Sequence, residues 1–271
     1  MMKIVKNAIK QILAAFGYEP RRSANITVCY ENFVNLTKSY EQKLNDDDAY
    51  ILPNEVRPKL LARLLGTPPS EAYFIVQALS KCKNVSGDVC EFGVAQGETS
   101  ALIANEIAQH GNKRLHLFDS FEGLPKPSAK DQLKDDIFSL GNIEAYAGTM
   151  NCPEDMVRTR LEAIAFPTTR YIIHKGFIEK SIYNKEALPK EVCFAYVDFD
   201  FYEPIKIALD FLHGVSPSGA IFIVDDYDFF STGAKTAVDE FINAHATTGT
   251  TYECLVPDTI FGHFAVLTKK G

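Results

Sequence analysis

Apolar runs and amphipathic segments alternate along the chain from Val89 onward. Runs such as Val89–Phe92 and Val192–Val197 have the length of buried strands. The pattern predicts strands at 89–92, 115–118, 171–174, 192–197, 220–224, 252–256 and 263–268, and helices at 100–110, 153–165, 202–213 and 233–246. Strands that alternate with helices build a mostly parallel sheet with helices on both faces. We therefore expect an α/β domain with a seven-stranded sheet over residues 86–271.

The first 85 residues precede this alternation, and we expect them to form a helical extension. Apolar side chains near helical spacing predict an amphipathic helix over 1–16, and residues 20–24 have the composition of a linker. Further helices are predicted at 58–65 and 70–83. The extension would cover the active site or join two subunits, and we expect a homodimer. The lysines of the first helix also suggest a weak contact with an anionic membrane surface.

A glycine turn follows the predicted strand 89–92. Glu91 lies near the end of this strand, Gly93 and Gly97 follow, and a helix begins after them. Glycines let the backbone turn sharply and approach a ligand closely. The E-x-G-x-x-x-G spacing differs from the G-x-G-x-x-G of dinucleotide-binding folds. The next predicted strand ends at Asp119, where an acid can accept hydrogen bonds from ribose hydroxyls, so the two acids together predict an adenosine-type ligand.

Carboxylates also follow two later strands. Asp198 comes after strand 192–197, and the pair Asp225 and Asp226 comes after strand 220–224. The carboxyl ends of parallel strands meet at one rim of the sheet, so these three acids should converge. Close carboxylates repel one another unless a cation lies between them, and Mg²⁺ suits an all-oxygen site. We predict that all three bind this ion. Asp200 on the same rim would contact substrate or a metal-bound water, or cap the following helix.

The polar stretch 121–151 is long for a connection inside a compact domain. Connections of this length are usually functional, and we expect a lid over the active site. Tyr146 within it would either contact the substrate or pack inside the closed lid. His263 is the first residue of the last predicted strand and is a second candidate base beside Asp198, although histidines near strand ends are often structural.

The overall composition of the chain limits which partners it binds and in which cell compartment it works. The net charge of −7 argues against nucleic acid as the main partner. The six cysteines are scattered without a C-x-x-C pair, which argues against zinc and is typical of reduced thiols in a cytoplasmic protein. No apolar run reaches the length of a membrane span, and lysines interrupt the first apolar stretch, unlike a signal peptide.

Several of these motifs occur together in an order that resembles a known family. The blocks are Glu91-Phe92-Gly93-Val94-x-x-Gly97, Phe118-Asp119-Ser120-Phe121-Glu122-Gly123-Leu124-Pro125, Lys175-Gly176-Phe177, Asp198-Phe199-Asp200-Phe201-Tyr202-Glu203 and Val224-Asp225-Asp226-Tyr227. Over residues 87–241 they resemble the macrocin O-methyltransferase (TylF-like) family. The resemblance implies a Rossmann-like class I methyltransferase fold, S-adenosylmethionine as cofactor, and Mg²⁺-dependent methyl transfer to a hydroxyl. The acceptor would be a small molecule or glycan, typically a sugar of a natural product or of a surface polysaccharide precursor.

The resemblance also implies roles for individual residues. Cofactor contacts are assigned to Glu91, Phe92, Gly93, Gly97, Thr99, Ser100, Asp119, Ser120, Gly176, Phe177 and Asp198. The implied metal ligands are again Asp198, Asp225 and Asp226. Apart from the resemblance, we expect Asp200, Tyr146 and Tyr227 to contact the substrate.

Two other enzyme classes and one non-enzymatic class compete with this interpretation. A nicotinamide-dependent sugar-modifying enzyme would need its glycine turn near the N-terminus, whereas the turn here begins about 90 residues in. A metal-dependent hydrolase could use the same aspartates. A scaffold protein that retains only the fold would have no need of the acids at the strand ends.

Overall fold

The computed structural model describes residues 54–109, 111–183, 186–246 and 249–271. All of these belong to one compact unit that spans Ala49–Gly271 and includes two helices that the sequence assigned to the extension. The helix predicted over 1–16 and the linker over 20–24 lie outside the described residues. Across the described ranges, no helix combines the length and apolar character that crossing a membrane requires.

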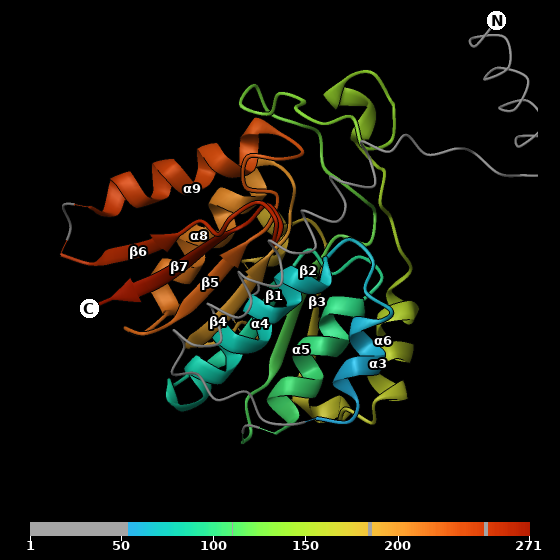
Figure 1. Cartoon of the computed structure of the whole chain (residues 1–271), viewed down its shortest axis with the longest axis vertical. Coiled ribbons are helices and arrows are strands. Elements are labelled where there is room, and N and C mark those ends of the chain that lie inside the picture. The colour runs from blue at the N-terminus through green and yellow to red at the C-terminus, as the bar shows by residue number, and fades with distance from the viewer. Residues whose placement is uncertain (1–53, 110, 184–185, 247–248) are drawn as a thin grey trace, which may run out of the picture. The chain divides into compact units, whose positions relative to one another are not determined.

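A seven-stranded sheet forms the centre of this unit, with the strand order β3-β2-β1-β4-β5-β7-β6 (Figure 1). The strands are β1 (Asp88–Phe92), β2 (Leu115–Asp119), β3 (Tyr171–Lys175), β4 (Val192–Val197), β5 (Ile221–Val224), β6 (Thr251–Leu255) and β7 (Ala265–Lys270). The first five pair in parallel, and β7 runs antiparallel to both β5 and β6. The predicted fold class, a mostly parallel α/β sheet, is confirmed.

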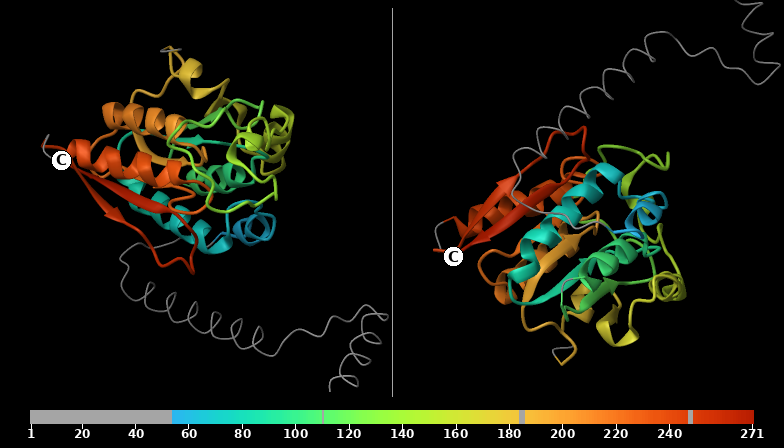
Figure 2. Two further views of the ribbon diagram at one scale, coloured as in Figure 1. Left: turned by 90° about the horizontal axis from the view of Figure 1, so that it is seen from above. Right: turned by 60° about the horizontal axis from the view of Figure 1, so that its bottom comes forward.

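Helices lie on both faces of the sheet. They are α3 (Arg57–Leu61), α4 (Pro69–Lys81), α5 (Glu98–Ala108), α6 (Glu154–Ala163), α7 (Ile178–Ser181), α8 (Tyr202–Val215) and α9 (Thr232–His245). Figures 1 and 2 show α4 and α5 over one face and α8 and α9 over the other. The sequence did not predict α7, because four residues are too few to show a helical period. Pro153 precedes α6 as its N-cap, which follows from its fixed φ and missing N–H.

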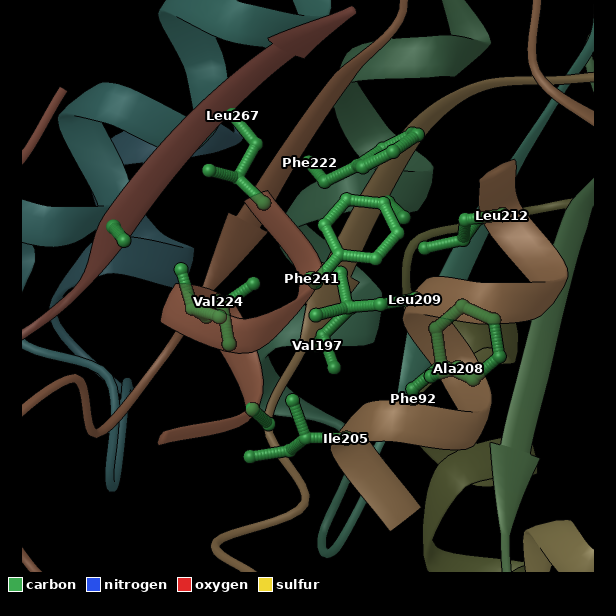
Figure 3. Close-up of a cluster of buried hydrophobic side chains, with 14 of the residues drawn as sticks. Phe92, Val197, Ile205, Ala208, Leu209, Leu212, Phe222, Val224, Phe241 and Leu267 are labelled. Atoms are coloured by element: carbon green, nitrogen blue, oxygen red, sulfur yellow. The ribbon is translucent and has the colours of Figure 1, made fainter. Parts of the chain in front are cut away.

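A large apolar cluster lies between the sheet and α8 and α9 (Figure 3). Phe92, Val197 and Phe222 of the central strands pack there with Leu209 and Leu212 of α8, and all five are fully buried. Burying side chains of this size stabilises the fold by roughly 1.5–3 kcal/mol each. Because β1, β4 and β5 are fixed in this way, the backbone at their carboxyl ends is held in a defined position.

The predicted lid, residues 121–151, contains one short 3-10 helix, Ile143–Tyr146, and is anchored to the body. Its backbone bonds to the residues around the start of α9. The Lys134 N–H donates to the Phe230 carbonyl at 3.0 Å, and the Thr232 N–H donates to the Gln132 carbonyl at 3.0 Å. Leu133 forms a bridge with Ser231. The lid is therefore docked against the end of the sheet that carries the strand-end acids.

Candidate active site

The turn after β1 requires glycine at its first position. Gly93 has a φ of 85°, and a Cβ there would lie 1.7 Å from the carbonyl oxygen of Asp198. The turn ends at Gly97, which precedes α5 with a φ of 82°. The backbone of the turn lies directly against the residue that follows β4, and only glycine, which has no Cβ, fits at position 93.

Asp119 at the end of β2 holds the same turn. Its Oδ2 accepts hydrogen bonds from the N–H groups of Val94 at 2.7 Å and Ala95 at 3.0 Å, and its Oδ1 accepts one from Phe121 at 2.6 Å. A carboxylate has about four acceptor positions, so this side chain retains capacity for ribose hydroxyls. Ser120 beside it bonds within its own loop, to the carbonyl of Gly123 at 2.9 Å.

Glu91 is nearly fully buried, and Ser100 donates a hydrogen bond to its Oε2. Its Oε1 has no hydrogen-bond partner among the described residues. Burial raises the pKa of Glu91 to about 8, with the charge of Asp119 adding to the rise. Among the predicted cofactor contacts, Phe92 belongs to the core and Thr99 bonds to Thr67 at 2.8 Å.

Three aspartates converge at the ends of β4 and β5. Asp198, Asp200 and Asp226 each place a carboxylate oxygen within 4.8 Å of the others. Asp200 and Asp226 have φ angles of 60° and 55°, a strained conformation for residues other than glycine and one that occurs often at functional sites. Two members of this cluster are predicted metal ligands, whereas the sequence assigned Asp200 to the substrate.

Asp225, the third predicted ligand, is engaged elsewhere. Its Oδ2 accepts a hydrogen bond from the Tyr196 hydroxyl at 2.6 Å, and its Oδ1 accepts one from the Asp226 N–H at 2.8 Å. Its carboxylate is not part of the group of three in the described chain, although it lines the same cavity.

The carboxylates of the cluster carry like charges and repel one another. Burial raises the pKa of Asp200 to about 6, and burial together with the neighbouring carboxylates raises the pKa of Asp198 and Asp226 well above the usual aspartate range. A cation between them would relieve this repulsion. Three carboxylate oxygens at this separation form a donor set that fits a hard divalent ion.

A further carboxyl, on α4, was not predicted. Glu71 is 1 % exposed, and its carboxyl lies beside the carboxyl of Asp225 and the hydroxyl of Tyr196. Burial raises its pKa well above the usual glutamate range, and the charge of Asp225 raises it further. The sequence could have indicated this burial, because Glu71 lies directly before an apolar run in the predicted helix 70–83.

A cavity of about 480 Å³ joins the turn to the cluster. Its walls include Gly93, Asp119, Ser120, Phe177, Asp198, Asp200, Asp225, Asp226 and the lid residues Leu124, Ile137, Phe138 and Met150. This volume is typical of a small-molecule site. The structure thus brings one face of the glycine turn, the predicted ribose acid and the strand-end acids to a single space.

Other predicted site residues do not line this cavity. Tyr146 is fully buried in the lid and donates a hydrogen bond to Asp136 at 2.7 Å. The Tyr227 hydroxyl donates to Asp239 at 2.8 Å. The ring of His263 stacks on Phe229, with 4.6 Å between the centroids, and Phe229 lines the cavity. Glu91, Phe92, Gly97, Thr99, Ser100 and Gly176 are also absent from the cavity walls.

Solved structures share this architecture. The O-methyltransferase NovP aligns with a TM-score of 0.63 at 20% identity, covering 89% of this chain and 100% of NovP. CalS11, a TDP-rhamnose 3'-O-methyltransferase of calicheamicin biosynthesis, aligns with a TM-score of 0.52 at 19% identity over 88% of this chain and 93% of its own. TomG from Streptomyces achromogenes, solved in complex with S-adenosylmethionine, gives 0.50 at 13% identity over 82% and 92%. The fold is therefore that of the Rossmann-like methyltransferases.

The sequence comparison narrows the class to a family. The family described as Macrocin-O-methyltransferase (TylF) matches residues 75–253, well over half of the chain. The chain belongs to this family, and the predicted resemblance is confirmed. It is therefore an S-adenosylmethionine-dependent O-methyltransferase. No curated protein sequence matches the chain.

Proposed function

We propose that this enzyme transfers the methyl group of S-adenosylmethionine to a sugar hydroxyl in a Mg²⁺-dependent reaction. The main observation is that the acid cluster and the glycine turn open into one cavity. Family membership and the sugar substrate named for CalS11 support a sugar as the acceptor. The nicotinamide and hydrolase alternatives are not favoured, because the family is one of O-methyltransferases.

The cofactor would bind along the turn after β1. Gly93 lines the cavity there, and Asp119 with Ser120 forms the adjacent wall. We assign a ribose hydroxyl to Asp119, which keeps about one free acceptor position beside its three backbone donors. Phe177, from the loop before α7, would contact the adenine ring. Glu91 and Ser100 then act by supporting the turn from within the fold.

We assign the metal to Asp198, Asp200 and Asp226, so that Asp200 replaces Asp225 in the predicted set. Asp225 would support the site by orienting Tyr196 and the Asp226 backbone. When bound, a hard divalent ion stabilises the developing alkoxide of the acceptor and orients it. The described carboxylates supply the charge and the oxygen ligands that hold such an ion.

The proposed reaction is a direct displacement. The acceptor oxygen attacks the methyl carbon, the bond from carbon to sulfur breaks, and S-adenosylhomocysteine leaves. The hydroxyl proton passes to a carboxylate of the cluster, for which we propose Asp198, because it lines the cavity and His263 does not. Correct placement of oxygen and carbon can contribute up to roughly 7–11 kcal/mol in well-oriented systems.

The ligand assignment is tested by three aspartate variants. Asp198→Asn and Asp200→Asn should weaken Mn²⁺ binding, measured by electron paramagnetic resonance, at least tenfold and abolish methyl transfer. Cofactor affinity by calorimetry should change little. Asp225→Asn should retain Mn²⁺ affinity to within about threefold. A large loss of Mn²⁺ binding in Asp225→Asn with none in Asp200→Asn would restore the predicted set, and full activity in EDTA would refute metal dependence.

The homodimer, the membrane contact of residues 1–16 and the cytoplasmic location remain predictions. Residues 1–53, which bear on the first two, lie outside the described chain.

A further inference from the structure

We propose that Tyr196 is a positioning residue of the proposed metal site, because its hydroxyl holds the carboxylate of Asp225 outside the acid cluster. A bound ion then meets three carboxylates instead of four, and the enzyme selects Mg²⁺ over Ca²⁺. This inference rests on the proposed function and concerns the buried residues behind the cluster.

The Tyr196 hydroxyl has a fixed place and a fixed direction. Tyr196 belongs to β4, is fully buried and donates a hydrogen bond to Oδ2 of Asp225 at 2.6 Å. Its hydroxyl oxygen also lies 3.4 Å from that of Thr67, which lies 2.8 Å from that of Thr99. A tyrosine hydroxyl carries a single hydrogen, so it accepts from Thr67 and donates to Asp225. The three hydroxyls therefore form a directed chain that ends at Asp225.

Asp225 is turned away from the cluster although Asp226, the next residue, belongs to it. The Asp225 N–H donates to the Val197 carbonyl at 2.9 Å, which continues the pairing of β5 with β4. One carboxylate oxygen of Asp225 accepts the Tyr196 hydroxyl, and the other accepts the Asp226 N–H at 2.8 Å. Both oxygens are thus engaged by donors that lie outside the cluster.

A second buried acid makes this position of Asp225 depend on the Tyr196 donor. The carboxyl of Glu71 on α4 is 1% exposed and lies beside the Asp225 carboxyl and the Tyr196 hydroxyl. Neighbouring carboxylates repel, and a buried carboxylate that loses a hydrogen-bond donor is left with an uncompensated charge. Asp225 lines the cavity that contains the cluster, so without the hydroxyl its carboxylate would turn toward a cation bound there.

The number of carboxylates separates the two common hard divalent ions. Mg²⁺ requires a near-octahedral shell and keeps several waters, whereas Ca²⁺ takes roughly six to eight oxygen ligands in a flexible shell. The three carboxylates of Asp198, Asp200 and Asp226 leave part of the shell to water and to the acceptor hydroxyl. A fourth carboxylate would fill that part and favour Ca²⁺. Tyr196 therefore sets the ion preference by restraining Asp225.

Metal competition tests the proposal on the full-length enzyme. The affinities of Mg²⁺ and Ca²⁺ are measured by displacement of Mn²⁺, followed by electron paramagnetic resonance. Tyr196→Phe keeps the ring and removes the hydroxyl, and we expect the ratio of Ca²⁺ affinity to Mg²⁺ affinity to rise at least tenfold. Adding Asp225→Asn removes the charge that would move, so the double variant should return to within about threefold of the parent ratio.

Tyr252→Phe is the matched control. It removes the hydroxyl of another buried tyrosine, which lies 2.9 Å from Nδ1 of His213 and does not line the cavity, and it should leave the ratio unchanged. Should Tyr196→Phe not fold, as judged by circular dichroism, Thr67→Val carries the test. It removes the hydroxyl that directs Tyr196 and should raise the ratio at least threefold.

Each outcome separates the inference from the proposed function. An unchanged ratio in the tested variant, with Mn²⁺ still bound, would overturn the inference and leave the proposed function intact. A raised ratio that persists in the double variant would also overturn it, because Asp225 would not be the cause. If the parent enzyme binds none of the three ions and transfers methyl groups in EDTA, the metal dependence of the proposed function fails instead.

Discussion

The carboxylate of Asp131 in the lid accepts a hydrogen bond from the backbone N–H of Tyr202, with 2.8 Å between the atoms. Tyr202 is the first residue of α8 and follows the acidic loop of Asp198 and Asp200. The N-cap residue of α8 supplies no side-chain cap, so the lid provides it. Gly233 lies against the same carboxylate, where a Cβ would come within 1.9 Å of Asp131 Oδ1. One buried side chain therefore joins the lid, the acidic loop and the start of α9.

The buried cap predicts a combined effect on stability and catalysis. Asp131→Ala leaves the Tyr202 N–H without its acceptor, and loss of an N-cap costs about 0.5–2 kcal/mol. We expect a lower melting temperature and a kcat reduced at least tenfold, with cofactor affinity nearly unchanged, because the acidic loop loses its support. The control Asp210→Asn removes an exposed carboxylate from the same helix and should be neutral. Stability loss with unchanged kcat would show that Asp131 acts on the fold alone.

A second prediction concerns the glycine turn. Gly93→Ala places a Cβ where the Asp198 carbonyl oxygen lies, and the positive φ adds strain. We expect S-adenosylmethionine affinity, measured by calorimetry, to fall at least a hundredfold. Gly111→Ala is the matched control, since its φ of 74° is similar but no atom lies within 4 Å of the added Cβ. If both variants bind the cofactor normally, the turn does not form the cofactor site.

The third prediction concerns acid stability and rests on a buried histidine. His174 is 5% exposed, and its Nε2 lies 2.9 Å from Nδ1 of His116. Burial lowers the pKa of His174 to about 4 from 6.5, and the neighbouring His116 adds to the shift. Between these values the unfolded chain binds a proton that the folded chain does not. The stability that depends on neutral His174 is therefore fully present above about pH 6.5 and is lost as the pH falls toward 4.

Denaturant unfolding at pH 4 to 7.5 measures this loss. The shift corresponds to at most about 3 kcal/mol at the acid end of the window. His174→Gln removes the titrating group, so the variant should be less stable at neutral pH but should show a flatter pH dependence. The same slope in the variant and the parent enzyme would assign the acid sensitivity to other groups.

Much of the fold was predictable because the hydrophobic period reports burial directly. Strands such as Val192–Val197 are buried on both faces and therefore form continuous apolar runs. The same pattern predicted that the acids after β2, β4 and β5 share one rim, since parallel strands bring their carboxyl ends together. The four-residue helix α7 was not predicted, because so short an element shows no helical period.

The sequence by itself determined the family, the sheet and the end of the sheet where the chemistry is placed, because these depend on local pattern and on motif order. Only the tertiary structure decided which acids meet. Asp225 and Asp226 are neighbours in the chain, yet one carboxylate accepts the hydroxyl of Tyr196 and the other joins Asp198 and Asp200. Side-chain direction depends on the backbone torsions of each residue, and the positive φ of Asp200 and Asp226 leaves no mark in the sequence. The direction of the Tyr146 side chain was likewise decided by the tertiary structure, where its hydroxyl donates to Asp136 inside the lid.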